Sequence, residues 1–296
     1  MKDHIKLFLF LLAASLVLSL SAPVQAGLAR DYLNVPVGSW YPAYYCTASQ
    51  TNLSALDTQI STTTNIFRVS HVNDLNGRCG GFDLLVPFAS TTMTNRLGLN
   101  YQRAGMGDLM LLAEMNIYGA PAYSKEDFKK YTPQNFASLH LRATLPTGDY
   151  NPSNPTNIGT NRFSVTPIVN FSFTPSVGED WWELYVMPTF YTDNCNYAGG
   201  TRLSQNPELN LEGHASHTFF PWLWAALDMY YTCGGETAIN GAWQNNANNV
   251  LSIGATANFT IWHDGWILFS YNQPLNAPAN AAQTRVFTLN IAQLIN

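Results

Sequence analysis

A histidine and a serine stand two residues apart at His214-Ala215-Ser216, a spacing that could support nucleophilic hydrolysis. A serine becomes a nucleophile when a base accepts its proton and a third group orients that base. In an extended chain Leu209 and Leu211 share one face, so His214 and Ser216 lie on the opposite, polar face. We therefore interpret the two side chains chiefly as a polar pair that faces an interior, and keep hydrolysis as an alternative.

Ionisable side chains recur on the polar faces of the alternating stretches described below. The set is Asp108, Glu114, His140, Arg142, Glu183, Glu212, His214 and Asp228. A charge on the lipid face of a membrane strand costs about 2–4 kcal/mol, so in a membrane barrel all eight would line the lumen. Glu114 and Arg142 fall on adjacent predicted strands and are expected to pair. The set is either a selectivity lining or a group of charges that satisfy one another in a packed interior. The sequence contains no metal-type spacing and predicts no cofactor.

The stretch that shows the alternation best is Val250 to Trp262, VLSIGATANFTIW. Leu251 and Phe259 belong to its apolar face, whereas Ser252 and Thr260 belong to its polar face. Strands of soluble proteins are usually about five or six residues long. This stretch has about twice that length, which is near what a tilted strand needs to cross a bilayer.

The same pattern repeats along the chain. The predicted strands are residues 37–47, 59–72, 82–88, 108–118, 135–145, 161–174, 181–193, 207–218, 222–232, 250–262, 266–272 and 284–293. One helix is predicted at 124–131, because Ser124 with Asp127 three residues later forms a capping-box start. From the fifth strand on, the connections alternate between long and short, and tryptophans such as Trp222 and Trp262 gather beside the short turns. This pattern predicts an all-β fold, a transmembrane antiparallel up-and-down β-barrel of about twelve strands.

Composition supports this class of protein. Only 11 % of the 296 residues are charged, against about 25 % in soluble domains, and mean hydropathy is -0.07. Helical membrane proteins need apolar runs of about twenty residues, whereas a barrel exposes only alternate residues to lipid. The net charge of -5 gives no nucleic-acid footprint. Lysines and an apolar run at the start predict a secretory signal peptide over residues 1–26, followed by one barrel domain over 27–296.

The four cysteines of an exported chain suggest disulfides. Cys195 and Cys233 both follow strands that run toward the long loops, so they are expected at the same rim, bonded to each other. Cys46 and Cys79 fall at opposite ends of the predicted strands, which a disulfide cannot span. Their state stays open at this point.

Several motifs resemble those of the meta-pathway phenol-degradation family of outer-membrane β-barrel transporters. The matching segments are 145–150 (LPTGDY), 157–164 (NIGTNRFS), 116–122 (NIYGAPA), 190–194 (FYTDN), 199–201 (GGT), 205–207 (QNP), the glycine pair 234–235 and 240–241 (NG). The resemblance covers the chain from about Leu33 onward and implies an outer-membrane location and passage of small solutes, aromatic or hydrophobic ones included. One departure is the last residue, Asn296, where outer-membrane barrels usually end in an aromatic residue.

Three functions are therefore compared: a passive outer-membrane channel, an outer-membrane enzyme of phospholipase type, and a barrel or exported β-sandwich without transport. The channel is the favoured hypothesis, with membrane lipid, a small-molecule solute and the outer-membrane assembly machinery as partners. We expect the residues before the first strand to be too few to plug the lumen, which leaves a long loop such as 146–160 for that role. An open lumen is expected to prefer cations mildly, because the predicted lumen carboxylates outnumber Arg142.

Overall fold

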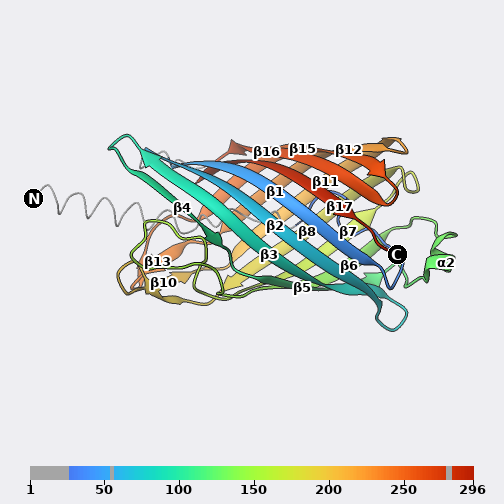
Figure 1. Ribbon diagram of the computed structural model, residues 1–296, viewed down its shortest axis with the longest axis horizontal. Helices are drawn as coiled ribbons and strands as arrows, with labels where there is room; N and C mark the ends of the chain where they lie inside the picture. Colours follow the sequence, from blue (N-terminus) through green and yellow to red (C-terminus); the bar gives the residue numbers. More distant parts are fainter. Residues whose placement is uncertain (1–26, 54–56, 278–281) are drawn as a thin grey trace, which may run out of the picture.

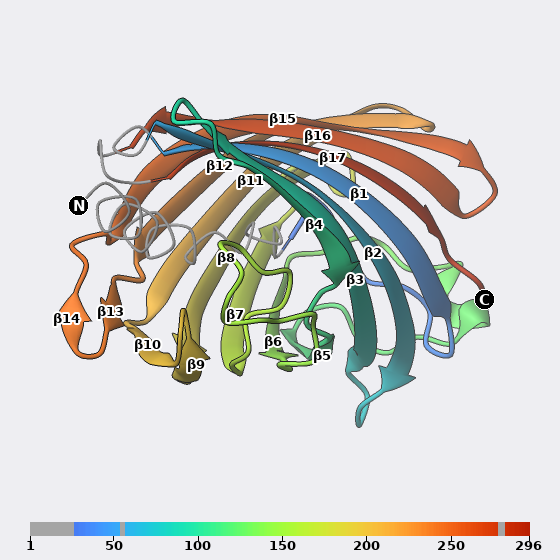
Figure 2. The same cartoon turned by 60° about the vertical axis from the view of Figure 1, so that its left-hand side comes forward.

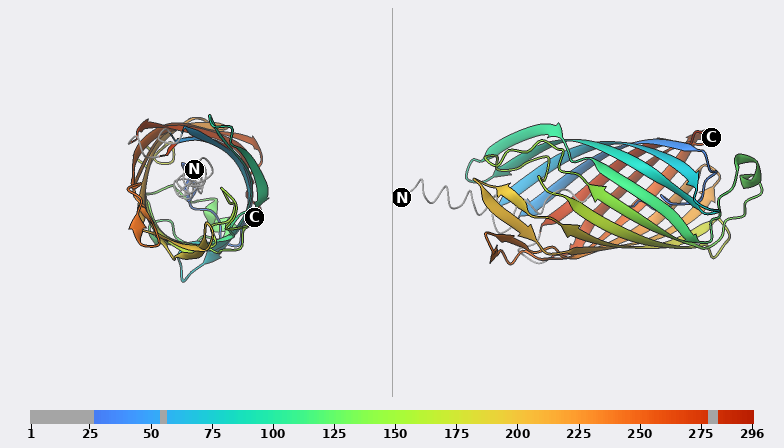
Figure 3. Two further views of the ribbon diagram at one scale, coloured as in Figure 1. Left: turned by 90° about the vertical axis from the view of Figure 1, so that its left-hand side faces the viewer. Right: turned by 90° about the horizontal axis from the view of Figure 1, so that it is seen from below.

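The computed structural model describes residues 27–53, 57–277 and 282–296, and the expected signal peptide lies outside the described residues. Twelve antiparallel strands form one closed barrel (Figures 1 and 3). They are β1 (Trp40–Leu53), β2 (Thr58–Asp74), β3 (Cys79–Asn95), β5 (Met110–Tyr118), β6 (Phe136–Thr144), β7 (Ser164–Phe173), β8 (Asp180–Tyr191), β11 (Glu208–Phe220), β12 (Leu223–Gly234), β15 (Asn248–Trp262), β16 (Gly265–Asn276) and β17 (Gln283–Gln293). The predicted fold class and strand number are confirmed.

Each strand of the barrel pairs with its neighbours along the chain, and the ring closes between the first and last strands. Residues 43–52 of β1 pair with residues 283–292 of β17 in one continuous antiparallel register. Closure gives each of the twelve barrel strands a partner on both sides, which is the condition for crossing lipid with strands. Among the described residues, no helix is long and apolar enough to cross a membrane.

Side-chain burial follows the alternation that the sequence shows. In β7, Val165 and Phe171 are exposed on the outside of the barrel, whereas Thr166 and Asn170 are buried inside it. Exposed aromatic residues also gather at the short-turn end, where the rings of Phe220 and Trp222 stack at 5.4 Å. An apolar outer belt and a polar interior are what lipid outside and a lumen inside require.

Both rims carry structure that alternation alone does not reveal. At the long-loop end, β9 (Asn194–Tyr197), β10 (Thr201–Gln205), β13 (Thr237–Ile239) and β14 (Ala242–Trp243) form a separate four-stranded sheet (Figure 2). The strand β4 (Asn100–Met106) pairs antiparallel with residues 88–94 of β3 at the same end. The sequence predicts residues 194–206 and 233–248 as long loops, and residues 90–107 as a polar loop that could briefly extend the strand pair. Strands of two to seven residues are too short to show a clear period.

The only helix among the described residues, α2 (Lys125–Phe128), lies at the short-turn end. The Ser124 hydroxyl oxygen accepts a hydrogen bond from the Asp127 amide at 3.2 Å, as the capping-box pattern predicts. The helix is shorter than the predicted 124–131, since the chain turns away after Lys129.

Residues 27–39, which we call the N-terminal segment, lie inside the barrel. Leu28, Ala29 and Tyr32 of this segment are buried, and its side chains bond to the inner wall. Seen end-on, the segment occupies the space within the ring of strands (Figure 3). The sequence argument concerns only whether so few residues can fill the lumen, and it does not predict that they lie inside the barrel. A segment this short cannot fill the lumen, but it narrows the lumen where it lies.

Candidate functional site: the barrel lumen

The structure places the eight ionisable residues predicted for the lumen as follows. Six are buried: Asp108, His140, Glu183, Glu212, His214 and Asp228. Glu114 and Arg142 are partly buried and line the interior cavities. The eight do not form one site, because their contacts divide them into separate groups along the inner wall.

The first group lies on β11 and β12. Nδ1 of His214 is 2.7 Å from Oδ1 of Asp228, and the Thr256 hydroxyl donates to the other Asp228 oxygen at 2.7 Å. Nε2 of His214 is 3.7 Å from Oε2 of Glu212, which is beyond hydrogen-bond distance. The rings of Tyr185 and Tyr230 approach the imidazole edge-on. These contacts fix the histidine between two carboxylates.

Ser216 is not bonded to His214. Its hydroxyl accepts a hydrogen bond from Nε of Arg30 at 2.8 Å and donates weakly to the carbonyl of Trp181. Both ring nitrogens of His214 instead face Asp228 and Glu212. A serine nucleophile requires the base within reach of its proton, and this arrangement does not supply it.

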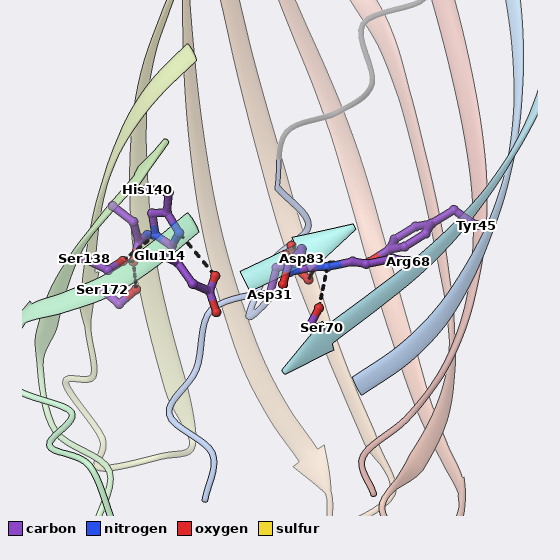
Figure 4. A network of polar contacts seen from close by, with 10 residues as sticks. Asp31, Tyr45, Arg68, Ser70, Asp83, Glu114, Ser138, His140 and Ser172 are labelled. Carbon is purple, nitrogen blue, oxygen red and sulfur yellow. Dashed lines mark hydrogen bonds and ion pairs between the residues drawn. The ribbon is translucent and has the colours of Figure 1, made fainter. Parts of the chain in front are cut away.

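The second group joins β5 and β6. Nδ1 of His140 is 3.3 Å from Oε2 of Glu114, and its Nε2 is 2.7 Å from the Ser138 hydroxyl (Figure 4). The ring of Tyr32, from the N-terminal segment, lies 4.0 Å from the imidazole. The expected pairing of Glu114 with Arg142 is wrong, because the strand register sets Glu114 opposite His140 and Leu112 opposite Arg142.

A third group, absent from the sequence prediction, centres on Arg68 of β2 (Figure 4). Its guanidinium donates to both oxygens of Asp31 at 3.1 Å and to Asp83 of β3 at 2.6 Å. Ser70 and Tyr45 accept further bonds from the same group. Arg68 and Asp83 alternate with outward residues of predicted strands, so the pattern applied to the other charges would have found them.

Arg30 fixes the N-terminal segment to the opposite part of the wall. Its backbone amide donates to Glu183 at 2.7 Å, and its guanidinium donates to Ser216, to Thr218 and to the carbonyl of Glu179. The only sequence signal for this role is a charged pair, Arg30-Asp31, close to the first strand of a chain that is poor in charge.

Asp108 lies just before β5 and holds the long loop between β6 and β7. Its carboxylate accepts bonds from the amides of Gly148 and Thr160, both at 2.8 Å, and from the Thr160 hydroxyl. Thr156 and Ile158 of that loop line the outer part of the lumen. The loop therefore narrows the long-loop end, as the sequence suggests for 146–160, in addition to the N-terminal segment.

The described residues enclose two cavities inside the barrel. The inner cavity, about 370 Å³, lies beside the N-terminal segment toward the short-turn end, and Arg30, Arg68 and His140 line it. The outer cavity, about 310 Å³, lies toward the long-loop end between Asp108, Arg142 and Glu212. The lumen is thus narrowed but not filled.

Burial shifts the pKa of two loop residues near the long-loop end, Arg162 and Tyr150. Burial lowers the pKa of Arg162, whose guanidinium lies 4.4 Å from the ring centre of Tyr191. Burial also raises the pKa of Tyr150, against the opposing effect of a hydrogen bond from Asn194.

All four cysteines are free in the structure, so the predicted Cys195–Cys233 disulfide is absent. Cys233 lies in the barrel wall opposite Leu209, whereas Cys195 belongs to β9 of the small outer sheet. The two share the long-loop end, as predicted, but a shared rim does not bring them into bonding geometry. Within residues 27–53, 57–277 and 282–296, no cluster of ligand-type side chains suits a metal ion.

Fold and lumen together define a β-barrel of the outer-membrane type. Residues 47–286 match the family described as "Putative MetA-pathway of phenol degradation", and the chain belongs to that family. No curated protein sequence matches the chain.

Solved structures support the fold. The outer membrane channel COG4313 from Pseudomonas putida F1 is similar, with a TM-score of 0.78 and 20 % identity over 90 % of this chain and 98 % of that one. The β domain of the Bordetella autotransporter BrkA has a TM-score of 0.53 and 9 % identity over 87 % and 99 %. The transport unit of the Escherichia coli autotransporter AIDA-I has a TM-score of 0.51 and 10 % identity over 96 % of each chain.

Proposed function

We propose that this protein is a passive channel of the bacterial outer membrane for small solutes, aromatic or hydrophobic ones included. The observation that carries the proposal is a closed barrel whose polar interior keeps cavities of about 370 and 310 Å³. Barrels of about eight strands are filled by their own side chains, whereas much larger ones leave an aqueous path. A barrel of twelve strands is intermediate in width, and its two cavities leave part of the interior free of side chains.

Location comes first in testing this proposal. We expect the protein in the outer-membrane fraction, cut after Ala26 by the export machinery, which N-terminal sequencing checks directly. A closed barrel should also resist unfolding in mild detergent, so boiled and unboiled samples should migrate differently on a gel. Recovery from the soluble periplasm with identical migration would exclude the membrane barrel.

Transport itself is tested by conductance across a planar bilayer into which the purified protein has been inserted. Discrete conductance steps without an energy source are the expected result. A folded, inserted protein that gives no conductance would favour a plugged barrel with a structural role.

An enzyme of phospholipase type is the remaining candidate. The contacts of Ser216 do not favour an enzyme, because its hydroxyl is hydrogen-bonded to Arg30 rather than to His214. We expect no release of fatty acid from phospholipid vesicles. Release that is lost in His214→Ala would support the enzyme instead.

A further inference from the structure

The inner cavity contains a buried polar atom without a partner. Asn258 of β15 lines this cavity, is 4 % exposed, and its Oδ1 has no hydrogen-bond partner among the described residues. A buried amide oxygen without a partner is unfavourable, unless a donor arrives from elsewhere. The position therefore favours a ligand that carries a hydrogen-bond donor.

Aromatic side chains surround the same part of the cavity. Trp224 lies opposite Asn258 in the strand register of β12 and β15, and Trp266 lies opposite Thr260, two residues further along β15. Both indoles line the cavity, and Trp266 stacks on Tyr41 at 5.6 Å. Asn258 is not the only such residue of this cavity, because Asn34 Oδ1 and Glu114 Oε2 are also buried without a hydrogen-bond partner. Of these three oxygens we consider Asn258 Oδ1, since flat indole walls beside an unpartnered acceptor suit a planar ring with a polar substituent that donates.

The charges around the cavity select against an anion. Arg68 and Arg30 both line it, but their guanidinium groups are already committed. Arg68 donates to Asp31, Asp83, Ser70 and Tyr45. Arg30 donates to Ser216, to Thr218 and to a backbone carbonyl. A carboxylate ligand would therefore find neither arginine free, and would also meet Glu114.

We propose that the inner cavity is a binding site for a neutral single-ring hydroxyaromatic molecule, whose hydroxyl donates to Oδ1 of Asn258 while its ring lies against Trp224 and Trp266. The ligand class rests on the proposed channel function, which it makes more specific. A phenolic hydroxyl has a pKa near 10 and so stays neutral and able to donate at pH 7. A cavity of about 370 Å³ is large enough for one such ring with its neighbouring water.

Three probes separate the contributions of the aromatic ring, the hydroxyl donor and the charge to binding. Phenol carries ring and donor, anisole carries the ring with the donor methylated, and benzoate carries the ring with a negative charge. Calorimetric titration of the detergent-solubilised protein should show phenol binding about ten-fold more tightly than anisole, the equivalent of one hydrogen bond of about 1.4 kcal/mol. Benzoate should bind more weakly than either.

Two variants and a control variant test whether Asn258 and Trp224 cause the binding preference. Asn258→Leu should remove the preference for phenol over anisole, whereas Trp224→Leu should weaken the binding of both. Asn249→Leu, on the same strand but exposed and bonded to Tyr231, should leave all three affinities unchanged. Heat-dependent gel migration shows that each variant is folded.

Equal affinities for phenol and anisole in the wild type would overturn the site, as would an unchanged preference in folded Asn258→Leu or tighter binding of benzoate. This titration does not depend on conduction. Conductance without phenol binding would remove the site and keep the channel, whereas phenol binding without conductance would keep the site and remove the channel.

Discussion

Asp31 and Arg68 join the N-terminal segment to the barrel wall, with both carboxylate oxygens 3.1 Å from one guanidinium nitrogen. The side chains are 10 % and 6 % exposed, so the ion pair is screened little by solvent. Arg68 also forms an ion pair with Asp83 at 2.6 Å. Its charge therefore keeps one carboxylate partner if Asp31 is replaced. The pair therefore controls where the segment lies more than whether the barrel folds.

Asp31→Asn should loosen the N-terminal segment while the barrel stays intact. The change removes a charge-assisted interaction worth about 1.5–3 kcal/mol. Single-channel conductance should rise or fluctuate between more levels, because the segment then lies less often across the lumen. Planar-bilayer recording measures this, with heat-dependent migration as the check on folding.

Asp57→Asn is the matched control for that experiment. Asp57 also pairs with an arginine, Arg96, but their side chains are 52 % and 85 % exposed, and such pairs contribute little. Its conductance should equal that of the wild type. If Asp31→Asn behaves in the same way, the segment is held by its other contacts and the role of Arg68 is smaller than argued.

Asp108→Ala should free the long loop that it holds. Three hydrogen bonds from Gly148 and Thr160 end on this carboxylate, and the substitution removes all of them. Cleavage within residues 145–160 by an added protease should become faster on intact cells. Asp193→Asn, which loses a bond to Arg202 in a different loop, should not change this rate. Equal rates for wild type and Asp108→Ala would show that the loop is held elsewhere.

The barrel itself was predictable because alternation is a local property. The residue type alone indicates that Val165 faces outward and Thr166 faces the interior. The same alternation in twelve strands predicts the barrel wall. Pairing between side chains was less predictable. Glu114 lies opposite His140 rather than Arg142 in the strand register. A shift of two residues in this register would keep the same side chains facing inward, so the alternation of polar and apolar residues cannot distinguish the two registers.

The N-terminal segment escaped prediction for a different physical reason. The length of the segment determines only whether it can fill the lumen, whereas its position depends on a few strong contacts. Arg30 and Asp31 each reach polar groups of the wall, and no period in the sequence connects them with Glu183 or Arg68. Contacts between an irregular segment and a sheet carry no sequence spacing, so only the structure reveals them.

The free thiols give a direct test of the cysteine state. Cys195 is exposed at the long-loop end, whereas Cys79 is buried. A membrane-impermeant maleimide added to intact cells should label Cys195 without prior reduction, and Cys195→Ser should abolish that labelling. Labelling that appears only after reduction would restore the disulfide with Cys233 that the sequence suggested.

Ion selectivity tests how the lumen charges act together. In the part of the chain that the structure describes, carboxylates outnumber guanidinium groups on the inner side of the barrel. The carboxylates are Asp31, Asp83, Asp108, Glu114, Glu183, Glu208, Glu212 and Asp228, and the guanidinium groups are Arg30, Arg68, Arg103, Arg142 and Arg162. An excess of fixed negative charge along a narrow path concentrates cations, so the reversal potential across a salt gradient should indicate mild cation preference.

Glu208 is the informative carboxylate in this set. It lines the outer cavity and accepts hydrogen bonds from the neutral amides of Asn210 and Asn248, at 3.2 and 2.7 Å. Asp228, by contrast, is bonded to His214, so a change there alters a neighbouring group as well. Glu208→Gln keeps the size of the side chain and removes one charge.

Glu208→Gln should therefore reduce the cation preference, and Arg162→Gln, on the same cavity, should increase it. The shifts should be larger in dilute salt, because the screening length is about 30 Å at 0.01 M and about 10 Å at 0.1 M. Glu126→Gln, in the exposed helix α2, should leave the reversal potential unchanged. Anion preference in the wild type, or shifts of the same sign in both cavity variants, would show that ions do not pass these side chains.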